Sequence, residues 1–143
     1  MNADSINLLK ECNSGCKMAI ESMERVEKNL ADNEMKSIID EYKDKHCQIK
    51  AQTYHLLKKD GEDGKDPNPM AAAMSKITTE VKMSFMGDSH QAAKLMMDGC
   101  NMGIQSICEH ENDCRNADET AKEVAHNLVK IEKEFMGKME KFL

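Results

Sequence analysis

The chain has 143 residues, of which 40% are hydrophobic and 32% are charged, as expected for a single soluble globular domain. Its formal net charge of −6 argues against nucleic acid and anionic membrane surfaces as partners. No apolar run approaches the roughly 20 residues of a membrane-spanning helix, and the first residues lack the basic and apolar regions of a signal peptide. We therefore expect a cytoplasmic protein that binds neither nucleic acid nor membranes.

Cysteine and methionine are both abundant, with six Cys and thirteen Met. Cytosolic thiols are normally kept reduced, and the absence of a Cys-x-x-C spacing excludes zinc-ribbon and thioredoxin-type motifs. Met side chains fill irregular gaps in a core, and they also bind soft metals such as Cu(I). Both uses of Met stay open, and surface positions such as Met18 and Met97 allow a homodimer.

Apolar residues recur at steps of three and four along most of the chain, which predicts helices rather than strands. The pattern places one helical hairpin over residues 4–59, with a break near Ala31, and a second over residues 88–143, with a break near Asn116. Asp88 and Asn116 are expected to cap the two helices of the second hairpin. The inward positions predicted for the second helix are Met35, Ile38, Tyr42, His46, Ile49, Thr53 and Leu56.

Residues 60–87 connect the two hairpins, and this connection is much longer than a tight turn needs. Within it, Asn68 and Pro69 signal the start of a short amphipathic helix over residues 70–86. Such a helix of about 25 Å, with extended flanks, can run the length of a bundle. The connection therefore predicts a crossover and an up-down-down-up bundle, in which the second and third long helices are parallel.

Two segments of the chain are related to each other. GCKMAIES at residues 15–22 and GCNMGIQS at residues 99–106 share five identities in eight positions, at a constant offset of 84. Ala31 and Asp32 match Ala117 and Asp118 at an offset of 86. The sequence therefore predicts a bundle made from two repeated hairpins.

The segment GCKMAIESM, within two hairpins joined by a long crossover, resembles the ferritin-like superfamily and its bacterial small four-helix-bundle branch. The resemblance covers most of the chain and implies an all-α bundle. Members place Glu on the first and third helices and Glu-x-x-His on the second and fourth, which together hold two iron or manganese ions. In this chain Cys16 and Cys100 stand at the first- and third-helix positions, Lys43 replaces the glutamate that would precede His46, and Glu132 stands at the fourth-helix histidine position. The resemblance therefore implies a di-iron set that has been lost, and a non-catalytic binding or stress-related module.

Counting from the helix ends places four potential ligands at similar heights near mid-bundle, one on each long helix: Cys16, His46, Cys100 and Glu132. Two thiolates, one imidazole and one carboxylate could hold a single Zn ion, while a softer site favours Cu(I). Alternatively, His46 and Glu132 hydrogen-bond each other within an apolar core. Two other functions therefore stay open beside the binding module: a metal-binding or thiol redox protein using Cys16, His46 and Cys100, and a purely structural or interaction bundle.

Two further pairs carry structural expectations. Cys12 and Cys16 lie one helical turn apart, so their Cβ atoms are about 5–6 Å apart and too distant for a disulfide. Glu123 and His126 form an intact Glu-x-x-His, but about two turns from the expected ligand level. We expect that second pair to lie on the solvated surface.

Overall fold

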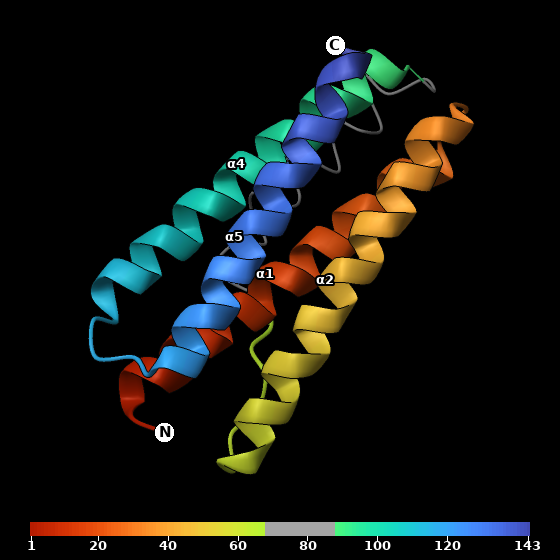
Figure 1. Ribbon diagram of the computed structural model, residues 1–143. Helices are drawn as coiled ribbons and strands as arrows, with labels where there is room; N and C mark the ends of the chain where they lie inside the picture. Colours follow the sequence, from red (N-terminus) through yellow and green to blue (C-terminus); the bar gives the residue numbers. More distant parts are fainter. Residues whose placement is uncertain (68–87) are drawn as a thin grey trace.

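The computed structural model describes residues 1–67 and 88–143, and this part of the chain forms four long α-helices (Figure 1). They are α1 (Ala3–Lys28), α2 (Asn33–Lys59), α4 (Ser89–Asp113) and α5 (Glu119–Met139), and the 3-10 helix η2 (Glu140–Phe142) follows. The described residues contain no strand, which confirms the all-α prediction for them. None of their helices is long and apolar enough to cross a membrane. The short helix predicted over residues 70–86 lies outside the described residues.

Each long helix begins after a side chain that accepts a hydrogen bond from a backbone N–H of its first turn. These caps are Asn2, Asp32, Asp88 and Asp118. A capped first turn supplies a partner for an N–H group that the helix itself cannot satisfy. The prediction of Asp88 as a cap is confirmed, whereas that of Asn116 is wrong. The backbone N–H of Asn116 donates instead to Asp4 Oδ2 at 2.9 Å, so Asn116 belongs to the connection and α5 starts later.

The helices pack so that α1 and α5 each contact all three of the other long helices, with α2 and α4 flanking this pair (Figure 1). Polar contacts join the helix ends. Ser89 at the start of α4 donates to Asp32 Oδ2 at 3.4 Å, and Lys141 in η2 pairs with Glu34 in the first turn of α2. The starts of α2 and α4 therefore lie at the same end of the bundle as the end of α5.

Within residues 1–67 and 88–143, the core residues form two apolar clusters. One contains Met23, Val26, Tyr42, Phe135 and Met139 among others, and the second contains Leu8, Leu9, Ile49, Leu57 and Leu128 among others. The predicted inward residues Ile38 and Leu56 are half-buried and pack against the two clusters, while their neighbours Ile39 and Leu57 are fully buried. Adjacent residues lie about 100° apart around a helix, so these neighbouring residues cover more than one direction around α2. This fits the packing of α2 against two helices, α1 and α5.

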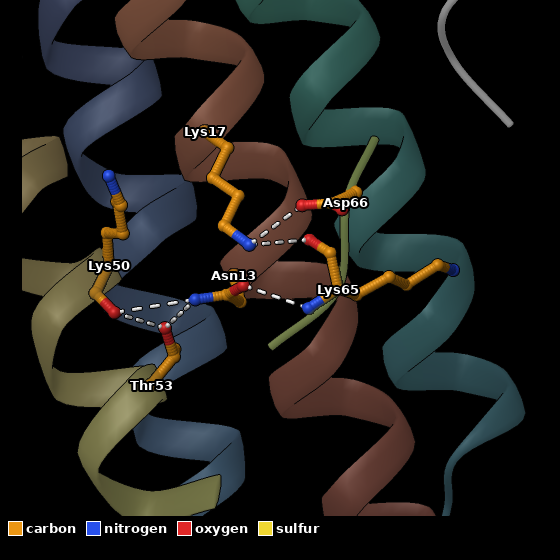
Figure 2. A network of polar contacts seen from close by, with 6 residues as sticks. All are labelled: Asn13, Lys17, Lys50, Thr53, Lys65 and Asp66. Atoms are coloured by element: carbon orange, nitrogen blue, oxygen red, sulfur yellow. Dashed lines mark hydrogen bonds and ion pairs between the residues drawn. The ribbon is translucent and has the colours of Figure 1, made fainter. Parts of the chain in front are cut away.

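The chain that follows α2 turns back against α1 and is fastened there by Asn13, as Figure 2 shows. The buried Asn13 amide donates to Thr53 Oγ1 at 3.1 Å and to Lys50 O at 3.5 Å, both on α2. Its Oδ1 accepts from the backbone N–H of Lys65 at 3.0 Å, and Lys17 Nζ donates to Lys65 O at 3.2 Å. The side chain of Asn13 thus links α1 to two other segments. Its NH2 group donates to α2, and its oxygen accepts from the segment that follows α2.

Candidate functional site

The four residues predicted to form a mid-bundle layer all lie in the core. Cys16 on α1, His46 on α2, Cys100 on α4 and Glu132 on α5 are each 6% exposed or less. Cys16 belongs to one apolar cluster and Cys100 to the other. On α2, Tyr42 before His46 belongs to one cluster and Ile49 after it to the other. On α5, Leu128 and Phe135 flank Glu132 in the same way, so the polar pair lies at the junction of the clusters.

His46 is held from two sides by hydrogen-bond acceptors. Its Nδ1 lies 2.6 Å from the backbone carbonyl of Tyr42, one helical turn earlier, and its Nε2 contacts Glu132 Oε1. A carbonyl and a carboxylate can only accept, so both ring nitrogens must donate, as they do in the imidazolium form. Burial lowers the pKa of His46, but the hydrogen bond and charge of Glu132 and the Tyr42 carbonyl outweigh it and raise the pKa above its usual value. The pair is therefore a buried ion pair.

The buried thiols are held in their neutral form. Burial raises the pKa of Cys100, and the charge of Glu132 and a hydrogen bond to it raise this pKa further. Burial likewise raises the pKa of Cys16, with contributions from Cys12 and Glu132, and it raises the pKa of Cys12 to about 12. Because the thiolate is the form that attacks electrophiles and binds zinc, these three cysteines are unreactive thiols at neutral pH.

The geometry of this layer is that of a hydrogen-bonded pair. Both ring nitrogens of His46 are occupied, Nδ1 by the Tyr42 carbonyl and Nε2 by Glu132, so neither points at a site shared with Cys16 and Cys100. In the described part of the chain, no three His, Cys, Asp or Glu residues form a group that could hold a metal ion. The hydrogen-bonded alternative is thus the observed arrangement, and the four-ligand metal site has no geometric support.

Three other residues at or near positions of the Glu-x-x-His pattern, Lys43, Glu123 and His126, lie outside this layer. Lys43 Nζ is 3.3 Å from Glu27 Oε1 on α1, so it forms an ion pair where the family pattern has a metal-binding glutamate. His126 contacts Glu111 with its side chain 63% exposed, and Glu123 is exposed as well. The expectation that Glu123 and His126 lie on the surface is confirmed.

A cavity of about 60 Å³ lies between α1 and α4, with Cys100 and Glu132 among its lining residues. Three pairs of identical residues from the two repeats line it: Gly15 and Gly99, Met18 and Met102, and Ser22 and Ser106. Glu132 faces this cavity, since a Cβ atom on Gly103 would lie 3.5 Å from its Oε2. The repeated residues at offsets of three and seven share a helix face. The sequence therefore indicates that each repeat has one such face, but it does not indicate that the faces of α1 and α4 meet at a cavity.

Comparison of the chain with protein-family models, with curated proteins and with solved structures gives no match. The described fold therefore defines the protein as an all-α four-helix chain. The resemblance to the ferritin-like superfamily stays a prediction from the sequence.

Proposed function

We propose that this protein is a non-catalytic, ferritin-like binding bundle whose ligand occupies the cavity between α1 and α4. The observation that carries this proposal is the lining of the cavity. Matching residues of both repeats face it, and a buried carboxylate, Glu132, and a buried thiol, Cys100, lie beside it. Apolar walls with a few convergent polar groups are typical of binding sites.

The ferritin-like, up-down-down-up part of the proposal is supported by the contacts at the helix ends. Asp32 and Ser89 hydrogen-bond each other at the starts of α2 and α4, while Asn116, between α4 and α5, contacts Asp4 at the start of α1. Two antiparallel hairpins joined by a crossover would bring these ends together. A simple up-and-down bundle would instead place the start of the third helix beside the end of the second.

The non-catalytic part of the proposal is supported by the state of the polar residues near the cavity. A general base or nucleophile needs a free lone pair and a suitable pKa. Glu132 and His46 are already paired with each other, and Cys100 is a protonated thiol. Purified protein loaded with iron should accordingly oxidise Fe(II) no faster than the His46→Leu variant, and a higher rate would contradict this part of the proposal.

The size of the cavity limits its occupant to a few atoms. Its volume of about 60 Å³ is less than half the roughly 150 Å³ of an engineered cavity that admits benzene. Liquid water takes up about 30 Å³ per molecule. The ligand, or the part of it that enters the cavity, is therefore a single ion or a very small group.

Xenon tests this proposal, because it is small, apolar and enters accessible apolar cavities. Under xenon pressure, the methyl NMR signals of Met18, Met23, Met96 and Met102, which line the cavity, should shift. Those of Met35 and Met139, which are fully buried elsewhere, should not. If no lining methyl responds, or if all six respond alike, the cavity is not a selective site, and a purely structural bundle becomes the better interpretation.

A further inference from the structure

The walls of this cavity are unusually rich in sulfur. Met18 and Met23 on α1, Met96 and Met102 on α4, and Cys100 all line it. Met18 and Met102 are the same position of the two repeats, on opposite walls, and Met102 is 39% exposed. Thioethers thus line the cavity from both helices, and one of them, Met102, is also in contact with solvent.

We propose that the cavity binds one soft monovalent metal ion, with Cu(I) as its physiological form, through the thioethers of Met18, Met23, Met96 and Met102. This inference rests on the proposed function and names its ligand. Thioethers are soft donors that select Cu(I) over harder ions. A bare ion also fits a volume that would exclude a drug-sized molecule.

The charges around the cavity favour a single positive charge. Among the described residues that line it, Glu11 and Glu132 are charged and none is a lysine or arginine. Each carboxylate has a cationic partner, Glu11 with Lys65 and Glu132 with His46, so these charges nearly cancel. A monovalent ion is therefore favoured over a divalent one, whose desolvation cost among neutral thioethers would be much larger.

Ligation by thioethers has a property that separates it from ligation by cysteine. A thioether carries no proton, so its affinity for the ion does not depend on its own deprotonation. A thiolate site must release a proton on binding, and its apparent affinity then rises about tenfold per pH unit for each thiol below the thiol pKa. Binding through Met should therefore be nearly independent of pH, and it should exclude zinc, which lacks suitable donors here.

The test is anaerobic competition for Cu(I) against a chromophoric chelator, with the full chain in a Cys47→Ser/Cys108→Ser background. That background removes the two exposed thiols, which would otherwise bind copper independently. Replacing Met18 and Met102 with Leu removes two sulfurs at nearly constant volume and should weaken Cu(I) binding by about tenfold or more. The control replaces Met35 and Met139, buried outside the cavity, with Leu, and should leave the affinity unchanged.

Three results would overturn the copper proposal: equal affinity in the Met18/Met102 variant and its parent, equal losses in both Met pairs, or an affinity that rises about tenfold per pH unit. Circular dichroism of each variant establishes that it is folded before titration. The proposed function is judged separately by xenon. Xenon shifts at the lining methyls without Cu(I) binding reject the ion alone, whereas the absence of both rejects the binding bundle as well.

Discussion

His46 of α2 and Glu132 of α5 form an ion pair at the junction of the two apolar clusters, and Tyr42 fixes the other side of the imidazole ring. Such a pair fixes the alignment of two helices more strictly than apolar contacts do, because a shift by one turn would leave two charges buried without partners. The charge of the same carboxylate raises the pKa of Cys100, and the carboxylate faces the cavity. Glu132 thus connects the packing of α2 and α5 to the candidate site.

Stability should fall as pH rises through neutrality. The pKa of His46 is raised in the native protein, so the native state holds this proton more tightly than the unfolded chain. The stabilisation is complete below the ordinary histidine pKa of about 6.5 and is lost as pH rises through the higher native pKa. Urea unfolding between about pH 6 and pH 8 measures it, below the range in which unfolded thiols ionise. Glu132→Gln should flatten this dependence, and an equally steep fall in that variant would contradict the assignment.

Removing one partner of the ion pair should be costly, and removing both should cost less than the sum. His46→Leu or Glu132→Leu alone leaves the other group buried without its partner, which destabilises by about 3–5 kcal/mol. The double variant replaces the pair by apolar side chains, so urea unfolding should yield a coupling energy of several kcal/mol, on the order of the single losses. Additive single effects would mean that the two side chains do not interact.

A matched control for this cycle lies between the same two helices. Lys45 Nζ on α2 is 3.9 Å from Glu134 Oε2 on α5, and both side chains are more than one-third exposed. Solvent screens such a pair, so the cycle of Lys45→Ala and Glu134→Ala should give less than about 1 kcal/mol of coupling. The contrast separates the effect of burial from the mere presence of opposite charges.

The six cysteines should divide into two reactivity classes. Cys47 and Cys108 are exposed, whereas Cys12, Cys16, Cys100 and Cys114 are buried. A disulfide reagent that releases a coloured thiolate when a cysteine attacks it measures this difference at neutral pH. It should modify the two exposed cysteines quickly and the other four only after unfolding in urea. Cys47→Ser/Cys108→Ser should abolish the fast phase. Rapid modification of a third thiol in the native protein would show that a buried cysteine is accessible.

Much of this arrangement could be predicted because it is encoded locally. Periodicity located the four long helices, and counting residues from the helix breaks placed His46 and Glu132 at the same height. The burial of both follows from their phase on α2 and α5. A direct hydrogen bond between His46 and Glu132 is one of two alternatives that the sequence allows, since spacing fixes which side chains approach but not whether an ion lies between them. That distinction depends on distances and on the Tyr42 carbonyl, which no sequence pattern marks.

The contacts of Asn13 illustrate what the sequence could not reveal. A polar residue beside the apolar Cys12 gives no sign of burial by itself, and it is buried because the segment after α2 returns to α1. Lys65 is 52 residues away in the chain, and contacts at such separations leave no periodic signal. The same limit applies to the cavity, since the repeat showed two similar helix faces but not that α1 and α4 turn them toward each other.

Gly64 allows the returning segment to approach α1, and a side chain there should loosen it. A Cβ atom on Gly64 would lie 2.6 Å from Oδ1 of Asn13. Asn13 cannot yield freely, because its amide is held by Thr53 and Lys65 as well as Lys50. We therefore expect Gly64→Ala to lower the free energy of unfolding by about 1–3 kcal/mol, through overpacking and a weakened buried hydrogen bond.

The matched control for Gly64→Ala is Gly137→Ala in α5. No atom lies within 4 Å of a Cβ built on Gly137, so this change should stabilise the helix by about 0.5–1 kcal/mol. Asn13→Ala removes the atom that Gly64→Ala would strike, so in that background the second substitution should add little further loss. Urea unfolding of the four variants measures both effects. If Gly64→Ala lowers the free energy of unfolding equally in the Asn13→Ala background, the steric clash is not with Asn13. Lys17 Nζ, 3.3 Å from the same Cβ position, would then be the next contact to remove.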